Sequence, residues 1–430
     1  MAIKKILLLS HIPARDEIPD ILLANSLTSS DVCVWKHPIL AKAREAICLI
    51  KPDIVILPEV RLEFTRDLAM LCKSWGIKVV QKRCEMGISR ETEITDELER
   101  CIFGNLDWMS CVDLDLVWGE EFASMLVEHG VPESKIKVIG GIGFDPYFAG
   151  WANPPVRQGT RVMFATGFGY ADCSPLYAAP ESKPGERINI DLVKADRENR
   201  CIFQDMMAKV IKKFPDYTYG VRQHPGEVFH AYGEVFKEKI ICLESIVTPM
   251  AVSWADVIIH AGSTMAYEAH LLNKPTINFR NTSLDKVVGK IGPIVNTSEE
   301  VIDLLGGLEF EKSNADPAVI KDLERYYGVV DGKAGKRAAE AILNLEINQT
   351  NIPNEWPKDT LKYITKGVYA NLVEWKCAAC NNVFWVQKLR AQVKCPYCGI
   401  GCVQRRYFVS HDDNGDEVHT QAYESGDERA

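Results

Sequence analysis

A Gly-Ser-Thr turn followed by a glutamate is the feature of this sequence best suited to hold an anion. Residues 254–279 contain a β-branched run, then Gly262-Ser263-Thr264, then a stretch of helical spacing. Such a turn at a helix N-terminus offers backbone N–H groups, two hydroxyls and the positive end of the helix dipole, which suit phosphate. Glu268 follows one helical turn later, where its carboxylate could accept hydrogen bonds from a ribose diol. The alternative is an ordinary strand–helix unit in which the serine or threonine only caps the helix.

His224 is the second group that could do chemistry. An alternating strand-like run, residues 217–223, ends just before it, and Pro225 follows it. Proline continues neither a central strand nor a helix interior, so we expect the histidine on a loop. A loop at the carboxyl end of a parallel strand faces the crevice where open α/β sheets bind ligands. A surface histidine in a turn is the alternative, but the Gly-Ser-Thr turn one strand unit later favours a shared phosphate site.

The elements that must position these residues form two α/β series. With 430 residues, 47% of them hydrophobic, the chain is long enough for two sizeable cores. Residues 150–159 carry two prolines and form the best candidate linker. We therefore predict two Rossmann-like domains, residues 1–150 and 151–348, each with a parallel sheet. The strands expected in the first are 5–10, 32–35, 54–57, 78–81, 114–118 and 137–140, and its expected helices include 39–50, 64–75 and 120–129. The second is expected to hold helices at 201–213 and 335–345.

These features together resemble the GT-B glycosyltransferases. Two Rossmann-like halves, a histidine-proline pair and a later Ser-Thr helix are similar to the branch that contains bacterial sialyltransferases, Kdo transferases and surface-carbohydrate biosynthesis proteins. Residues 135–147 (KIKVIGGIGFDPY) and 331–334 (DGKA) resemble motifs of the surface-carbohydrate group. The resemblance covers roughly residues 3–345. It implies a nucleotide-sugar donor bound by the second domain and an acceptor bound by the first.

The resemblance also implies roles for individual residues. His224 would contact the donor phosphate and assist departure of the leaving group, Ser263 and Thr264 would bind phosphate oxygens, and Glu268 would hold the ribose. A loop directly after the expected strand at 161–166 contains two glycines, where backbone can approach a ligand closely. The candidate donor site therefore consists of Gly167, Gly169, Arg222, His224, Gly262, Ser263, Thr264 and Glu268.

In the related sialyltransferases two acids followed by a glycine supply the general base from the first domain. The nearest match is residues 84–87 (CEMG), which contain one acid, so Glu85 is the expected base. Glu59, Asp16 and His11 are alternatives, because each follows an expected strand or lies in the first loop. Transfer from a nucleotide sugar needs such a base for the acceptor hydroxyl and stabilisation of charge on the departing phosphate.

The expected function is that of an inverting glycosyltransferase, which moves a sugar from a CMP- or UDP-linked donor to a surface glycan or lipid-linked precursor. A non-hydrolysing sugar-nucleotide epimerase is one alternative, and it would act without an acceptor. A nucleic-acid-directed glycosyltransferase or binding protein is another. The net charge of −9 counts against the last, because nonspecific nucleic-acid binders carry a broad positive field.

Two cysteine pairs near the C-terminus predict a structural zinc site. Cys377, Cys380, Cys395 and Cys398 have the spacing C-x2-C-x14-C-x2-C, and four thiolates suit tetrahedral Zn2+ in a closed site. We place a zinc ribbon at residues 373–409, after a linker at 349–372. A disulfide framework is disfavoured because the other ten cysteines are scattered and no secretion signal is visible, which indicates a reducing cytosol.

The predicted ribbon is basic and the segment after it is acidic. Residues 376–406 contain six basic residues and no acid, interspersed with aromatic residues. Such a surface suits an anionic partner, either nucleic acid or a phospholipid surface at the inner face of the membrane. The alternative is a small solvated domain whose aromatics form its own core. Residues 410–430 are predicted to be an acidic disordered tail. The sequence contains no run of 18 apolar residues, and it does not indicate an oligomeric state.

Overall fold

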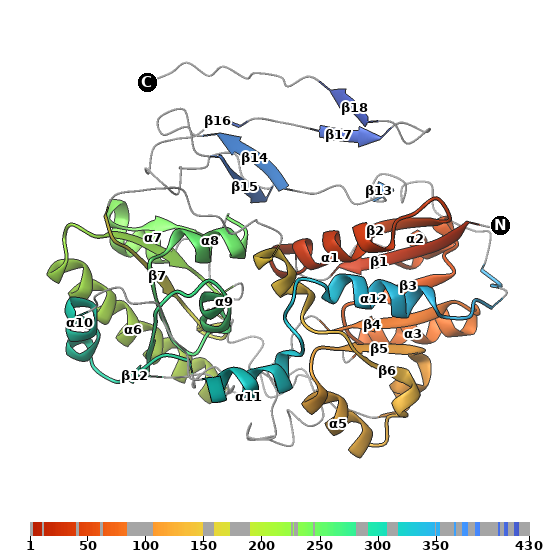
Figure 1. Cartoon of the computed structure of the whole chain (residues 1–430), viewed down its shortest axis with the longest axis horizontal. Coiled ribbons are helices and arrows are strands. Elements are labelled where there is room, and N and C mark those ends of the chain that lie inside the picture. Colours follow the sequence, from red (N-terminus) through yellow and green to blue (C-terminus); the bar gives the residue numbers. More distant parts are fainter. Residues whose placement is uncertain are drawn as a thin grey trace.

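The computed structural model describes most of the first 352 residues and six short strands beyond them. Two α/β halves lie side by side, and the later strands lie along one side of them (Figure 1). The described residues are 3–10, 13–39, 43–60, 63–83, 106–148, 159–172, 190–224, 227, 231–243, 246–280, 291–307, 317–348, 350–352 and strands β13 to β18.

The first half is built on a sheet of order β13-β2-β1-β3-β4-β5-β6, parallel except for β13. The order reverses between β1 and β3, which makes this the topological switch point of the first sheet. The strands are β1 (Lys4–Ser10), β2 (Val32–Pro38), β3 (Ile54–Leu57), β4 (Lys78–Lys82), β5 (Leu114–Val117), β6 (Ile136–Val138) and β13 (Thr365–Lys366). The helices are α1 (Pro13–Leu27), α2 (Ala43–Ile50), α3 (Glu63–Ser74) and α5 (Glu120–Glu128), with 3-10 turns at Leu106–Cys111 and Glu133–Lys135.

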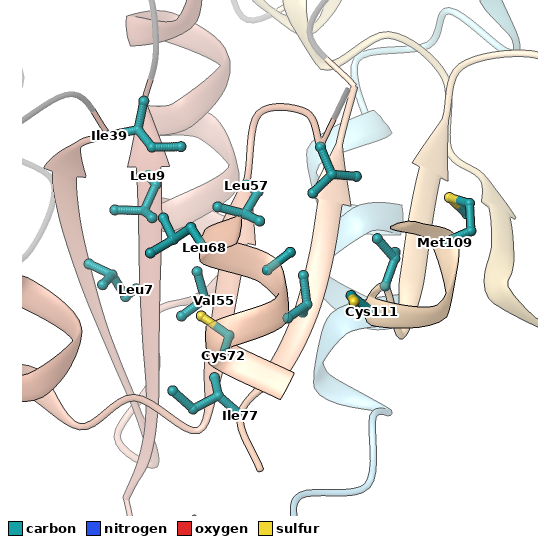
Figure 2. Packing of buried hydrophobic residues seen from close by; sticks show 14 of the residues in the cluster. Leu7, Leu9, Ile39, Val55, Leu57, Leu68, Cys72, Ile77, Met109 and Cys111 are labelled. Atoms are coloured by element: carbon teal, nitrogen blue, oxygen red, sulfur yellow. The ribbon is translucent and has the colours of Figure 1, made fainter. Parts of the chain in front are cut away.

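Helices cover both faces of the first sheet, which explains why its strands are apolar throughout rather than alternating. Leu7 and Leu9 of β1 lie on the face that packs against α2 and α3, and Figure 2 shows them near Leu68 and Cys72 of α3. The intervening Leu8 points to the opposite face, toward α1 and α12 (Ala334–Leu343). One strand thus contributes to two separate core layers.

The second half holds a fully parallel sheet of order β12-β11-β10-β7-β8-β9. With β7 taken as the first strand, this is the strand order of the doubly wound dinucleotide-binding fold. Its topological switch point lies between β7 and β10. The strands are β7 (Arg161–Ala165), β8 (Thr218–Arg222), β9 (Ile241–Cys242), β10 (Val257–His260), β11 (Thr276–Phe279) and β12 (Ile294–Val295). The helices are α6 (Ile190–Lys213), α7 (Ala231–Phe236), α8 (Thr248–Trp254), α9 (Met265–Leu271) and α10 (Ser298–Gly307), with a 3-10 turn at Lys237–Lys239.

The chain returns from the second half to the first through α11 (Pro317–Tyr327) and α12. Asp145, in the turn η3 (Ile142–Tyr147), accepts hydrogen bonds from the backbone N–H groups of Ala334 at 3.1 Å and Gly335 at 2.8 Å. It thereby caps the N-terminus of α12, which packs into the core of the first half. The two short motifs at 135–147 and 331–334 therefore meet at the crossover between the halves.

The carboxyl edges of the two sheets face each other across this crossover. Ile18 and Ile21 of α1 pack against Val247, which follows β9. Phe144 of the first half packs edge-on against Tyr267 of α9, with ring centroids 5.0 Å apart. Both contacts involve segments that begin at a carboxyl edge, so the interface places the two ligand-binding edges against one another.

The C-terminal strands form two small antiparallel sheets. One has the order β15 (Val383–Gln387), β14 (Leu372–Lys376), β16 (Val403–Gln404), and β17 (Phe408–His411) pairs with β18 (Glu417–Thr420). The four cysteines predicted to bind zinc fall outside the described residues, in the parts of the sequence that separate β14, β15 and β16. Strand β18 falls within the segment for which disorder was predicted. Among the described residues, no helix is long and apolar enough to cross a membrane.

Candidate functional site

Three loops meet at the carboxyl edge of the second sheet. They follow β7, β8 and β10, which are neighbours in the sheet, and they carry Gly167 and Gly169, His224, and the Gly-Ser-Thr turn respectively. A Cβ atom on Gly167 would lie 3.0 Å from the carbonyl oxygen of Ala261, and one on Gly169 would lie 2.7 Å from the imidazole of His224. The loop after β7 therefore touches both other loops and joins the separately predicted motifs into one site.

The imidazole of His224 rests on Gly169 and is exposed to solvent. The backbone of Gly169 is not in the left-handed region, so glycine is required there for space rather than for conformation. Asp196 of α6 lies close enough for its carboxylate to interact electrostatically with His224. Burial raises the pKa of Asp196, and the backbone N–H of Tyr170 donates to it at 2.9 Å.

Beneath His224, the buried carboxylate of Glu227 binds donors from three segments. It accepts hydrogen bonds from the hydroxyl of Thr166, the backbone N–H of His224 at 3.2 Å and the hydroxyl of Tyr232 at 2.8 Å. The backbone N–H of Phe168 also points at it, at 3.4 Å. Sequence reasoning missed Glu227, although its position three residues after the histidine was a usable signal.

The Gly-Ser-Thr turn is held from below by His260, the last residue of β10. Its Nδ1 accepts hydrogen bonds from the backbone N–H groups of Gly262 and Ser263, each at 3.2 Å. Gly262 has a φ of 75°, a left-handed conformation that glycine adopts without strain. Two of the amides expected to face phosphate thus donate to an imidazole.

His260 is a second residue that the sequence pattern does not point to, because it is the last residue of an apolar strand. Its side chain is fully buried, and burial lowers its pKa to about 3. It is therefore neutral at ordinary pH, and since Nδ1 accepts, its proton is on Nε2. Within the described part of the chain, Nε2 has no hydrogen-bond partner, and Asn278 lies beside His260 on the neighbouring strand.

The helix after the turn is shorter than its sequence suggests. The stretch of helical spacing begins at Ser263 and is expected to end near residues 273–275, but α9 spans the seven residues Met265–Leu271. Its dipole is correspondingly less able to hold an anion, so the hydroxyls of the turn matter more. Thr264 is the N-cap residue in an α conformation, and its side chain makes no capping hydrogen bond. The exposed Thr264 hydroxyl therefore does not serve as a plain helix cap.

The carboxyl group of Glu268 is enclosed where the two halves meet, although the residue as a whole is partly exposed. Burial raises its pKa to about 7, against the opposing effects of Tyr147 and Arg222. The Tyr147 hydroxyl comes close enough to influence this pKa, yet Tyr147 Oη and Glu268 Oε2 both lack a well-formed hydrogen bond among the described residues. A buried oxygen without a hydrogen bond lowers the stability of the protein, and a ligand group that donates to it would remove this cost.

Arg222 has a more local role than expected. Its guanidinium donates to the carbonyl oxygens of Leu243, at 2.6 Å, and of Ile246, and to the hydroxyl of Thr248 at 3.1 Å. These bonds fix the loop between β9 and α8. Arg222 thereby shapes the wall of the site and contributes positive charge near Glu268.

At the facing edge of the first sheet, the described residues include two of the four candidates for the general base. Asp16 is 1% exposed, whereas Glu59 is half-buried in the loop after β3. Glu85 and His11 lie outside the described residues. Beside Asp16, Asp20 forms a buried ion pair with Lys82 and accepts a hydrogen bond from Ser10 at 2.5 Å. Enclosure makes Asp16 poorly placed to take a proton from an acceptor.

No group of three or more His, Cys, Asp or Glu side chains among the described residues is arranged to hold a metal ion. The four predicted zinc ligands are not in that part of the chain.

No family model and no curated protein matches this sequence. Solved structures do match. The UDP-GlcNAc 2-epimerase of Neisseria meningitidis bound to UDP-GlcNAc has a TM-score of 0.52 at 14% identity, over 79% of this chain and 100% of that one. The enzyme of the same name from Methanocaldococcus jannaschii, in complex with UDP-GlcNAc and UDP, has a TM-score of 0.51 at 14% identity, over 79% and 99%. The wall teichoic acid polymerase TagF has a TM-score of 0.51 at 12% identity, over 79% and 89%. The two Rossmann-like halves of this chain thus form a GT-B fold.

Proposed function

We propose that this protein is an enzyme that binds a nucleotide sugar at the carboxyl edge of the second sheet and transfers the sugar to an acceptor. The observation that carries the proposal is the contact of Gly169 with His224 and of Gly167 with Ala261, which unites three loops into one edge site. The site lies at the topological switch point of a doubly wound sheet, where such folds bind nucleotides. Similarity in fold to proteins solved with UDP and UDP-GlcNAc supports this choice of ligand.

The donor phosphates would lie between His224 and the Gly-Ser-Thr turn. The exposed imidazole can donate a hydrogen bond to a phosphate oxygen, and the hydroxyls of Ser263 and Thr264 can donate from the other side. Charge that builds up on the departing phosphate would be stabilised by these donors. Removing one such donor typically costs about 3 kcal/mol in the barrier.

His260 bears on which groups of the turn could bind phosphate. Its Nδ1 accepts from the amides of Gly262 and Ser263. The hydroxyls of Ser263 and Thr264 are therefore the donors that we assign to phosphate, and any use of the two amides would require the turn to rotate away from His260.

The ribose would bind Glu268. A carboxylate accepts hydrogen bonds but donates none, so two vicinal hydroxyls are well-matched donors for it. Access requires Tyr147, which belongs to the first half, to move away from the carboxyl group. Nucleotide binding would thus be coupled to a change in the contact between the halves.

The acceptor would approach from the first half, where Glu85 is our proposed general base and Glu59 is the better placed of the two described alternatives. A surface glycan or a lipid-linked precursor is the proposed acceptor, reached from the cytoplasm at the inner face of the membrane. Residues 373–409 are proposed to hold one structural zinc ion, and their basic, aromatic character suits an anionic partner such as a phospholipid surface or nucleic acid.

A sugar-nucleotide epimerase is the second candidate, favoured by the structural similarity to two UDP-GlcNAc 2-epimerases. The two reactions differ in whether they need an acceptor and in what happens to the proton at C2 of the sugar. An epimerase removes and replaces the proton at C2 of the sugar without an acceptor. A transferase breaks the bond between the anomeric carbon and phosphate and needs an acceptor.

The test combines binding with isotope exchange. Thermal shifts with CMP, CDP, UDP, GDP and their sugars identify the nucleotide, since a ligand at 100 times its dissociation constant adds about 2.7 kcal/mol of stability. The nucleotide sugar that binds is then incubated in D2O without acceptor. Deuterium at C2 establishes the epimerase, whereas an intact donor that is consumed only with added glycan or lipid acceptor establishes the transferase. The absence of a shift with every nucleotide would reject both.

A further inference from the structure

Glu227 has no assigned role in the proposed mechanism. The residue is 8% exposed, and its carboxylate accepts a hydrogen bond from the backbone N–H of His224. All the partners that the structure gives it are donors: two hydroxyls and two backbone N–H groups. An ionised carboxylate can satisfy all of them, because it has about four acceptor positions and no proton.

The donors come from separate segments that must be held together for the site to exist. Thr166 and Phe168 belong to the loop after β7, His224 to the loop after β8, and Tyr232 to α7. Thr166 adds a second link, because its hydroxyl accepts from the backbone N–H of His224 at 3.0 Å. The main chain of His224 is thus fixed to the loop that carries Gly169.

Gly169 completes the arrangement from the side-chain end. Its missing Cβ leaves the space that the His224 ring occupies, 2.7 Å from where that Cβ would be. The main chain of His224 is fixed from below and its ring rests on Gly169, so both ends of the side chain are defined by one loop.

We propose that Glu227 is the positioning residue of this site, which holds His224 against the loop of Gly169 so that the imidazole keeps one place relative to the departing phosphate. This role rests on the proposed function of His224. It predicts that loss of the Glu227 acceptors displaces the ring rather than removing it. A displacement of about 1 Å is enough to reduce turnover by about 100-fold.

Two variants displace the ring by different routes. Gly169→Ala places a methyl group where the ring lies, and the exposed ring can yield, so we expect this variant to fold. Glu227→Leu removes every acceptor at similar volume. Glu227→Gln is the conservative variant. Its amide oxygen can still accept hydrogen bonds from the Thr166 hydroxyl and the His224 backbone N–H, and its NH2 group can donate to the Tyr232 hydroxyl. Gly307→Ala is the matched control for added volume, because a Cβ atom there meets nothing within 4 Å.

The readouts are kcat with UDP-GlcNAc, the dissociation constant of UDP, and the imidazole Cε1–H NMR signal of His224, assigned by its loss in His224→Gln. We expect Gly169→Ala and Glu227→Leu to lower kcat by roughly 10- to 100-fold, with UDP affinity changed by less than about 3-fold. The His224 signal should shift in both, Glu227→Gln should lie closer to the wild type, and Gly307→Ala should match it.

The proposal is overturned if Gly169→Ala folds and its His224 signal and turnover equal those of the wild type, or if Glu227→Gln loses as much as Glu227→Leu while both fold. Should the wild-type protein neither bind UDP nor consume UDP-GlcNAc, the proposed function fails for this nucleotide. The His224 signal still decides the positioning role in that case, because it needs no substrate.

Discussion

Replacement of Glu268 by glutamine should stabilise the ligand-free protein and weaken nucleotide binding. Burial raises the pKa of this carboxyl group from 4.5 to about 7. A raised carboxyl pKa means that the unfolded chain loses its proton more readily, so this group lowers the free energy of unfolding as the pH rises from about 4.5 to 7. At pH 8 the full difference between the pKa values of the unfolded and folded states lowers the free energy of unfolding by about 3 kcal/mol. At pH 5 most of this destabilisation is absent.

The variant Glu268→Gln removes the ionisation while keeping the shape. We therefore expect its melting temperature to exceed that of the wild type by several degrees at pH 8 and by little at pH 5, since about 1 kcal/mol shifts the melting temperature of a domain of 150–250 residues by about 2–4 °C. Differential scanning calorimetry at the two pH values measures this. UDP affinity should fall by roughly 10- to 100-fold at pH 8, because hydrogen bonds to a charged group are worth about 1.5–3 kcal/mol.

Glu300 provides a control of opposite sign. Its exposed carboxylate accepts from the backbone N–H groups of Asn296 and Thr297, and these bonds lower its pKa. Glu300→Gln should therefore destabilise the protein at neutral pH, with the effect fading as the pH falls below the ordinary pKa of glutamate. If Glu268→Gln is no more stable than the wild type at pH 8, or is stabilised equally at pH 5, ionisation of the enclosed carboxyl group does not destabilise the protein as inferred.

The other predictions concern the remaining parts of the site and the C-terminal segment. His224→Ala should abolish most turnover and leave the melting temperature nearly unchanged, and full activity in a donor-consumption assay would remove His224 from the mechanism. His260→Phe should keep the buried volume but leave two backbone amides without an acceptor, which lowers stability by about 1–3 kcal/mol in a denaturant titration; unchanged stability would show that the turn does not depend on the imidazole. The purified protein should contain one zinc ion per chain by elemental analysis, and Cys395→Ser with Cys398→Ser should release it; a zinc-free wild type would refute the ribbon.

The fold class was predictable because apolar strands that alternate with amphipathic stretches have few ways to bury both faces. The strand expected at residues 54–57 is β3, and the one expected at 5–10 extends by a single residue in β1. The helix expected at 201–213 was wrong at its start, since α6 begins at Ile190. Residues 190–200 are rich in charge, which obscured their periodicity.

The sequence by itself was enough to predict which residues form the candidate site, because loop position and residue type at strand ends are local properties. His224, the Gly-Ser-Thr turn and Glu268 were each predicted from their own neighbours in the sequence. Only the tertiary structure decided how these groups are held. Whether His260 faces the turn, whether Glu227 collects donors from separate segments, and whether Tyr147 encloses Glu268 depend on contacts between segments distant in sequence, and no local pattern encodes which buried polar atoms will meet.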